Sequence, residues 1–325
     1  MTSGRAATAV AAALAADRLL GEPPEVVHPT VLMGRAISLY EKGAHALYPG
    51  SPNDARRLRL AGLLLAAALP ALALVSARAV LRAFPAGLRW SAEVALLWTT
   101  ISMRGLADAA LAVERELESG DLGAARVRAG EIVGRDTERL SEGEVARAAV
   151  ESVAENASDG VVAPMLYGFL FGAPGALAHK AINTLDSMVG HPHPPHRDLG
   201  RASARLDDFA NLLPARLTAL TAAAVSGNFA HTWKIACLHG PLTRSPNAGW
   251  AEAAFAGALG IALGGANSYG GVVREGPTLG VGRPPEADDI VRAVGLMHRV
   301  CVLLVALPLL PLAAAFAARR LSSRG

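Results

Sequence analysis

Long apolar runs separated by short polar clusters dominate the pattern of this chain. Residues 60–77 carry no charge between Arg59 and Arg78, and residues 300–318 carry none between Arg299 and Arg319. Each run approaches the roughly 20 apolar residues that a transmembrane helix needs. The pattern therefore predicts a membrane-spanning helix at each place, the first with a kink at its central proline.

Other apolar segments are shorter or interrupted. Residues 160–178 are uncharged but contain Pro164 and Pro174, which predicts a broken helix that is buried in protein or lines a polar cavity. Residues 217–230 can span only if the helix extends backward, and residues 90–103 include Glu93 and predict a tilted or interfacial helix. Residues 6–16 resemble a signal peptide, but the polar signature that follows at once favours a retained helix.

Two stretches read as extramembrane structure. In residues 104–158 charges return at helical spacing, Gly120 and Asp121 mark a helix stop and a new cap, and Ser141 with Glu144 forms a capping box. Residues 231–299 hold two glycine-rich polar stretches around an alanine-rich helix at residues 251–263. We predict amphipathic helices outside the membrane in the first stretch, and an extramembrane loop and helix segment in the second.

Composition agrees with this pattern. The chain has 325 residues, of which 52% are hydrophobic and 18% charged, with a formal net charge of +3. The basic residues are scattered beside apolar runs, which argues against a nucleic-acid partner, and they flank several runs on both sides, which leaves orientation open. We predict an all-α polytopic integral membrane protein with about four to five transmembrane or re-entrant helices, forming a single domain over residues 1–325.

Polar side chains crowd both ends of the broken helix. Polar groups beside hydrocarbon are costly unless they are paired, hydrated or used, so such crowding indicates a functional site. For any one residue, a helix cap or an interhelical hydrogen bond is an equal alternative. Glu144, Glu151 and Glu155 share one helix face, which is either a solvated acidic stripe or part of a cation site.

The remaining candidates lie in loops and turns. His28 precedes a proline and is held extended, so its ring either supports the loop or faces a substrate. The glycine-rich stretches can hold phosphate or carboxylate oxygens on backbone N–H groups, or they are tight interhelical turns. Cys237 and Cys301 lie far apart and support neither a disulfide framework nor a cysteine metal site.

Several of these strings together resemble a known family. They include Val133-Gly-Arg-Asp-Thr137, Glu151-Ser-Val-Ala-Glu-Asn-Ala-Ser-Asp-Gly160, Asn183-Thr-Leu-Asp-Ser-Met-Val-Gly190, Ala204-Arg-Leu-Asp-Asp208, Ser245-Pro-Asn-Ala-Gly249 and Asn267-Ser-Tyr-Gly-Gly271, along with the polar stretch at residues 17–41. In this order, over nearly the whole chain, they resemble the cobalamin biosynthesis protein CobD/CbiB family.

One loop departs from the family pattern. Where the family usually continues with a tyrosine and a polar, charged stretch, this chain reads His191-Pro-His-Pro-Pro-His196. The prolines prevent the three histidines from sharing a helix face, which argues against a zinc site. The departure puts in doubt whether this loop contacts the corrinoid as its relatives do.

The resemblance implies an adenosylcobinamide-phosphate synthase in the cytoplasmic membrane. Such an enzyme joins adenosylcobyric acid to (R)-1-amino-2-propanol O-phosphate through an amide and is expected to use ATP and Mg²⁺. Because ATP and corrinoid intermediates are made inside the cell, its active site is expected to face the cytoplasm. Beyond these substrates and the lipid bilayer, other cobalamin-pathway proteins and a second copy of the chain are left open as partners.

The same resemblance places roles on individual residues. Carboxylates suit Mg²⁺, and the metal candidates are Glu151, Glu155, Asp159, Asp186, Asp207 and Asp208. The catalytic candidates are Glu151, Glu155, Asp186, His28, Arg135 and Lys180. The substrate-binding candidates are Asn156, Ser158, Asn183, Ser187, Arg205, Ser245, Asn247, Asn267, Ser268 and Tyr269.

Two other classes of protein compete with the enzyme. A distant branch of this membrane family is associated with β-lactamase regulation, and a non-catalytic sensor of that kind would share the helix pattern. A transporter would explain polar residues inside broken helices, but the sequence shows no convincing internal repeat. The complete polar strings favour the enzyme.

Overall fold

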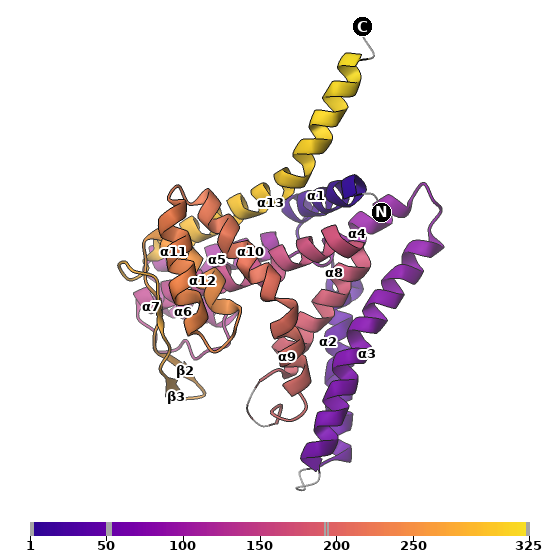
Figure 1. The fold of residues 1–325 in the computed structure, drawn as a ribbon. Coiled ribbons are helices and arrows are strands. Elements are labelled where there is room, and N and C mark those ends of the chain that lie inside the picture. Colours follow the sequence, from indigo (N-terminus) through magenta and orange to yellow (C-terminus); the bar gives the residue numbers. More distant parts are fainter. Residues whose placement is uncertain (1–2, 50–53, 192, 194, 323–325) are drawn as a thin grey trace. The chain divides into compact units, whose positions relative to one another are not determined.

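The computed structural model describes residues 3–49, 54–191, 193 and 195–322. These residues are mainly helical and form two compact units (Figure 1). Unit 1 comprises Met1–Ser102 and Ala163–Asn211, and unit 2 comprises Met103–Val162 and Leu212–Gly325. The all-α prediction is confirmed, and the division into two units is a feature that the sequence analysis did not anticipate.

Unit 1 is built around two long helices, α3 and α8, that run side by side (Figure 1). Its elements are α1 (Ser3–Leu20), the short 3-10 helix η1 (Glu25–Val27), α2 (Pro29–Leu47), α3 (Asp54–Ala83), α4 (Arg89–Trp98), α8 (Ala163–Val189) and α9 (Arg201–Ala210). One stripe of α3 is buried, while its leucines on other faces, including Leu60, Leu63 and Leu72, are more than half exposed. Exposed leucines along a long apolar helix are what contact with lipid requires.

The break that was predicted in residues 160–178 lies within α8. Gly172 has a φ of 71°, which glycine adopts without strain, and Pro174 follows it. The backbone N–H of Ala173, freed by the break, donates to Oε1 of Glu93 on α4 at 2.6 Å. The buried Glu93, which had suggested an interfacial helix, therefore satisfies the broken backbone.

Unit 2 combines helices with short strands. Its helices are α5 (Met103–Glu118), α6 (Leu122–Gly130), α7 (Glu142–Asn156), the π-helix η2 (Ala157–Val162), α10 (Leu212–Val225), α11 (Phe229–His239), the 3-10 helix η3 (Gly240–Leu242), α12 (Ala248–Leu259) and α13 (Ala287–Ser322). Its strands are β1 (Leu263–Gly264), β2 (Asn267–Tyr269), β3 (Val272–Arg274) and β4 (Thr278–Leu279). β1 pairs with β4 and β2 with β3, both antiparallel, within the stretch that was predicted as loop and helix.

Local capping signals in unit 2 were read correctly. The carboxylate of Glu144 accepts from the backbone N–H of Ser141 at 2.8 Å and from its hydroxyl at 2.7 Å, which completes the predicted capping box. Asp121 caps α6 by accepting from the N–H of Ala124 at 2.9 Å. These caps fix where α6 and α7 begin, and α7 carries the acidic face that the site uses.

Three described helices are long and apolar enough to cross a membrane: Asp54–Ala83, Glu142–Val189 and Ala287–Leu310. They contain the predicted runs at residues 60–77 and 160–178, and residues 300–310 of the run at 300–318. Leu212–Val225 is apolar but shorter, and it ends before the predicted run at residues 217–230 does. Among the described residues, three long candidate spans and one shorter apolar helix thus agree with the predicted all-α polytopic membrane protein.

Candidate functional site

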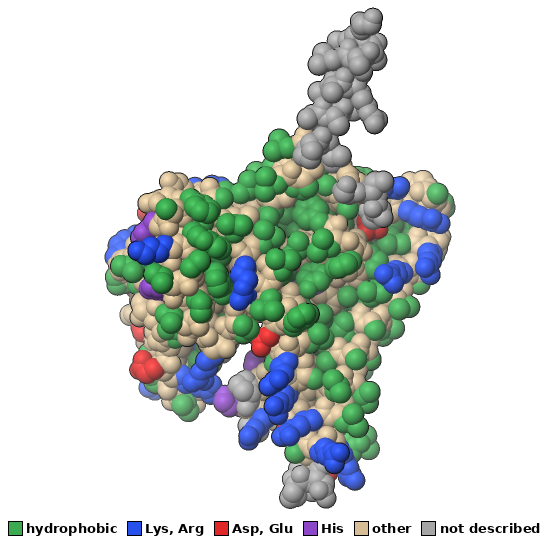
Figure 2. Space-filling view, in the orientation of Figure 1, with side chains coloured by type: hydrophobic (Ala, Val, Ile, Leu, Met, Phe, Trp, Pro, Cys, Tyr) green, Lys and Arg blue, Asp and Glu red, His purple; other side chains and the backbone are tan. Residues whose placement is uncertain are grey.

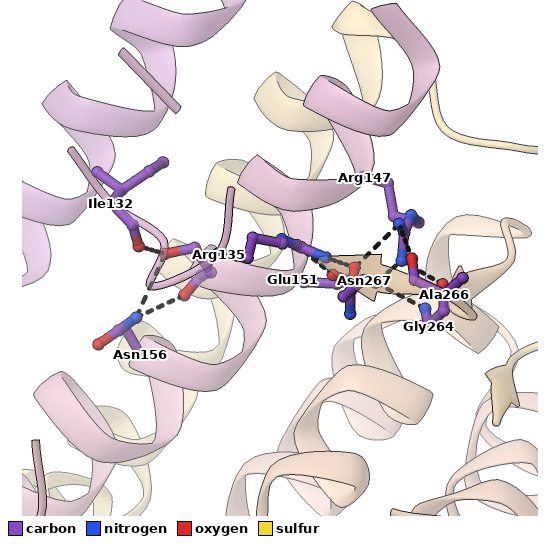
Figure 3. Close-up of polar contacts among 9 residues, drawn as sticks. Ile132, Arg135, Arg147, Glu151, Asn156, Gly264, Ala266 and Asn267 are labelled. Atoms are coloured by element: carbon purple, nitrogen blue, oxygen red, sulfur yellow. Dashed lines mark hydrogen bonds and ion pairs between the residues drawn. The ribbon is translucent and has the colours of Figure 1, made fainter. Parts of the chain in front are cut away.

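A buried ion-pair cluster in unit 2 joins α7 to the glycine-rich turn before β2 (Figure 3). Glu151 Oε2 accepts a hydrogen bond from Arg135, and Oε1 accepts from Arg147 at 3.3 Å and from the N–H of Gly264 at 2.6 Å. The side chains of Arg135 and Arg147 are 6% and 11% exposed, and that of Glu151 is 10% exposed. Both oxygens of Glu151 are therefore engaged within the protein.

Asn267 extends the cluster to β2. Its Oδ1 accepts from both Arg135 and Arg147, the latter at 3.1 Å. Arg147 also donates to the carbonyl oxygens of Gly264 and Ala266, the latter at 3.0 Å (Figure 3). Arg135, Glu151 and Asn267, which belong to three separate family-like strings, thus meet at one place.

A second carboxylate, Asp136, anchors the hairpin of β2 and β3. It accepts from the hydroxyl of Ser268 at 2.6 Å and from the N–H groups of Gly270 and Gly271 at 2.9 and 2.7 Å. These hydrogen bonds, that from Ser268 first, lower the pKa of Asp136. Ser268, a predicted substrate-binding residue, has its hydroxyl used in this anchor.

The glycine-rich turn was predicted either to hold anionic oxygens or to form a tight connection. The N–H of Gly264 donates to Glu151, and that of Gly265 donates to the carbonyl of Pro277 at 3.1 Å. With the two amides held by Asp136, these N–H groups are directed to protein acceptors. The structure thus shows these amides bonded within the protein, and an anion-binding role for the turn stays a prediction.

A cavity of about 250 Å³ lies beside this cluster. Six of the predicted site residues line it, namely Arg135, Glu151, Glu155, Asn156, Asn267 and Tyr269. Such a volume is below the roughly 300–1,000 Å³ of pockets for drug-sized ligands, so the cavity fits a small polar group and not a corrinoid ring system.

Glu252 is the principal site residue that sequence reasoning missed. It lies on α12 and lines the same cavity as Glu151 and Glu155. Burial raises the pKa of Glu252 well above its usual value, and the charges of Glu155 and Glu151 raise it further against a smaller opposing effect of Arg135. The sequence signal was present, since Glu252 is the single charge in an alanine- and glycine-rich helix.

The carboxylates of this cavity suit a cation, but too few of them are grouped to hold a metal ion without other ligands. Among the residues that the structure describes, no group of three or more His, Cys, Asp and Glu side chains could hold a metal ion together. Mg²⁺ commonly binds through one or two carboxylates plus phosphate oxygens and water. Glu155 and Glu252 both line the cavity and could supply that smaller share.

Three predicted residues lie where α7 ends: Asn156 is its last residue, and Ser158 and Asp159 belong to the π-helix η2. Asn156 donates to the carbonyl of Ser152 at 2.9 Å, and Ser152 donates to the carbonyl of Ile132 at 2.9 Å (Figure 3). Ser158 and Asp159 lie inside η2, and Ser158 is buried. A π-helical turn is rare and often marks a functional site. Nothing in the sequence had indicated this turn.

Ser245 and Asn247 stand at the start of α12. The hydroxyl of Ser245 accepts from the N–H groups of Asn247 and Ala248 at 3.2 and 3.3 Å. The side-chain oxygen of Asn247 accepts from Arg216 at 3.1 Å. Residues 245–249 therefore form a tight turn in the structure. A substrate-binding role for Ser245 and Asn247 stays a prediction.

Unit 1 gathers the other predicted residues near α8 and α9. The charge of Asp186 and the side-chain amides of Asn183 and Asn211 act on Asp207, which is 8% exposed. Asp208 also acts on Asp207, and Arg205 acts on Asp208. These residues form a second polar cluster, which we describe separately from the cavity of unit 2.

Asp207 gives a test of this second cluster. Burial, with the charge of Asp186, raises the pKa of Asp207 from 3.8 to about 7. Because the folded state then holds the proton more tightly than the unfolded state, stability falls as pH rises from about 4 to 7. Between pH 5 and 7 the ionisation of Asp207 should lower the free energy of unfolding of the wild-type protein by about 2 kcal/mol. We expect Asp207→Asn to lack this decrease, as measured by thermal unfolding in EDTA.

The control for Asp207→Asn is Glu25→Gln, at an exposed carboxylate of unit 1. It is expected to leave the pH profile of wild type unchanged. An Asp207→Asn protein with the wild-type pH profile would show that Asp207 is ionised at neutral pH and has an ordinary pKa.

His28, Lys180 and Ser187 also belong to unit 1. His28 Nδ1 accepts from the N–H of Thr30 at 3.2 Å and caps α2, and burial lowers its pKa. Lys180 is near enough for its charge to lower that pKa further, and the hydroxyl of Ser187 donates to the carbonyl of Asn183 at 2.9 Å. His28 thus supports the loop, which was one of the two alternatives; that its ring faces a substrate stays a prediction.

The histidine-rich loop is described only in part, because Pro192 and Pro194 lie outside the described residues. The rings of His191 and His196 stand edge to face with their centroids 5.7 Å apart. His196 Nδ1 lies 3.0 Å from Glu41 Oε1. This contact ties the loop to α2 within unit 1.

Comparisons with known proteins identify the family. The family model described as CobD/Cbib protein matches residues 10–297. The chain is 45% identical over 297 residues to "Cobalamin biosynthesis protein CobD" of Chromobacterium violaceum, covering 91% of this chain and 94% of the relative. It is 42% identical to the protein of the same name from Brucella suis, covering 91% and 93%.

"Cobalamin biosynthesis protein CbiB" of Salmonella typhimurium is 41% identical over 300 residues, covering 90% of this chain and 92% of the relative. No solved structure matches the chain. Relatives with this name, similar over nearly their whole length, support a role in cobalamin biosynthesis. The chain belongs to the CobD/CbiB family.

Proposed function

We propose that this chain is an ATP-dependent amide synthase that joins adenosylcobyric acid to (R)-1-amino-2-propanol O-phosphate, with Mg²⁺, in the cytoplasmic membrane. The observation that carries the proposal is the cavity of unit 2. Residues from three family-like strings line it, and Glu151, Glu155 and Glu252 bring three carboxylates to its wall.

The reaction needs activation, because forming an amide from a free carboxylate is uphill in water. A carboxylate oxygen of the corrinoid attacks the γ-phosphorus of ATP, and the bond to ADP breaks. The amine nitrogen then attacks the acyl carbon, the C–O bond to phosphate breaks, and phosphate leaves with that electron pair. Before this attack the ammonium form of the amine loses one proton, and the nitrogen loses a second proton as the amide forms, so bases in the site take up two protons while the amide keeps one N–H.

The cavity fits the small, charged end of this chemistry. Mg²⁺, when bound, would neutralise the charge that develops on the transferred phosphoryl group. Glu155 and Glu252 could contact that ion together with phosphate oxygens and water. Because the cavity measures about 250 Å³, the corrinoid body would stay outside it and present only its carboxylate.

Glu151 has a positioning role in this proposal and does not contact the cation. Its bonds to Arg135, Arg147 and Gly264 hold the wall of the cavity in position. Preorganised charges of this kind act without further rearrangement during a reaction. The roles of the second polar cluster, of His28 and of Lys180 stay predictions.

The proposal is tested by reconstitution. Detergent-purified full-length protein is incubated with adenosylcobyric acid, aminopropanol phosphate, ATP and Mg²⁺, and the amide is sought by mass spectrometry. Product that requires all four components is expected. If folded protein binds the corrinoid but forms no product, the protein alone is not the synthase. If it does not bind the corrinoid, the regulatory alternative is favoured.

A further inference from the structure

A groove between α2 and α3 in unit 1 is unrelated to the proposed reaction. It has a volume of about 350 Å³, within the roughly 300–1,000 Å³ range of ligand pockets. On α3 it is lined by Arg57, Leu60, Ala61 and Leu64, which are spaced as one helix face. The facing residues of α2 follow the same spacing.

Small residues keep this groove open. Gly43 of α2 lines it, and a Cβ added at Gly43 would meet no atom within 4 Å. Ala61 lies on the α3 side, where its carbonyl accepts from the hydroxyl of Tyr40 at 2.9 Å. The Tyr40 hydroxyl and the Ala61 carbonyl are thus paired with each other inside the protein, and Leu60 and Leu64 beside them are apolar.

The two ends of the groove differ in polarity. At one end the guanidinium of Arg57 lies over the ring of Tyr48, 5.8 Å from its centroid, and 3.6 Å from Asp54. Toward the other end Leu60 and Leu64 are each 58% exposed. Since α3 is a candidate span that begins at Asp54, the arginine end belongs at the membrane surface and the leucines in the hydrocarbon.

Positive charge gathers at the surface end. Figure 2 shows Lys and Arg side chains gathered around the lower end of α3. Arg56 and Arg57 are exposed in its first turn and outnumber Asp54, while Arg59 is held by Asp198 at 2.8 Å. The Arg57 side chain itself is 63% exposed. An exposed guanidinium beside a tyrosine ring favours a phosphate oxygen as its ligand.

We propose that this groove binds an anionic phospholipid, with the headgroup phosphate at Arg57 and one acyl chain along Leu60 and Leu64. The apolar wall selects a lipid over a free phosphate, because a headgroup alone would leave these leucines uncovered. The positive end selects an anionic lipid over a zwitterionic one.

Native mass spectrometry of the delipidated full-length protein tests this site. Phosphatidylglycerol and phosphatidylcholine with the same acyl chains are added at equal concentration, and sn-glycerol 3-phosphate is added separately. The expected result is preferential binding of one phosphatidylglycerol. Equal binding of the two lipids, or binding of sn-glycerol 3-phosphate as tight as that of the lipid, would overturn the proposal.

Two variants separate the contacts. Arg57→Gln is expected to weaken phosphatidylglycerol binding about fivefold. Its matched control is Arg56→Gln, which removes the same charge from the same turn at a residue that does not line the groove. Equal losses in the two variants would mean general attraction to a positive surface and would overturn the site.

Gly43→Leu fills the groove and leaves the arginines in place. Because a side chain at Gly43 meets no neighbouring atom at its Cβ, the variant is expected to fold with the thermal stability of wild type. It should lose the bound phosphatidylglycerol. A stable Gly43→Leu protein that still binds phosphatidylglycerol would show that the acyl chain of the lipid does not lie in this groove.

Discussion

Replacing Glu151 with glutamine is expected to destabilise unit 2 by about 3–5 kcal/mol, because it leaves the charges of Arg135 and Arg147 buried without their carboxylate. The three side chains are at most 11% exposed, so water can replace little of the lost interaction. The measurement is the thermal or denaturant unfolding of detergent-purified protein.

Glu142→Gln is the matched control for that variant. Glu142 begins the same helix but is exposed, so its replacement is expected to change stability by no more than about 0.5 kcal/mol. A Glu151→Gln protein as stable as wild type would show that the two arginines find other partners and that this cluster does not hold the cavity wall.

Replacing Glu155 with glutamine is expected to slow amide synthesis about 10²-fold while the protein stays folded. Under the proposed function, Glu155 contacts the divalent cation from the cavity wall, and an amide is a weaker ligand for Mg²⁺ than a carboxylate. The readout is kcat at several Mg²⁺ concentrations, because loss of a ligand should also raise the Mg²⁺ concentration that half-saturates the enzyme.

Glu118→Gln, at an exposed position of α5, serves as the control for Glu155→Gln and should keep wild-type kcat. A Glu155→Gln enzyme with full activity and an unchanged Mg²⁺ dependence would remove Glu155 from the cation site. A loss of activity with unchanged Mg²⁺ dependence would keep Glu155 in the site and assign it another role.

Local signals predicted the parts of this fold that depend on neighbouring residues. The capping box at Ser141, the cap at Asp121 and the spans around Pro70 and Val300 all follow from residues close in sequence. The break in α8 was also predicted, from the prolines of this segment. That Glu93 on α4 completes the break was not, because the contact joins residues 80 positions apart in the chain.

The candidate site shows the same division. The polar strings pointed to Glu151, Glu155 and Asn267, which do meet. The use of glycine N–H groups by Asp136 and Glu151, and the approach of Glu252 from α12, depend on long-range packing that spacing does not encode. An isolated carboxylate in a small-residue helix was the one local clue to Glu252.

If the amide is made in the cavity of unit 2, as proposed, a bulky side chain that fills this cavity should abolish synthesis. Gly134 lines the cavity, and a Cβ added there would meet no atom within 4 Å. Gly87 in unit 1 has equally open surroundings and provides the control. Amide formation by Gly134→Phe and Gly87→Phe is compared at equal thermal stability. We expect Gly134→Phe to lose product while Gly87→Phe keeps it. Synthesis by Gly134→Phe at the wild-type rate would show that the amide is made elsewhere.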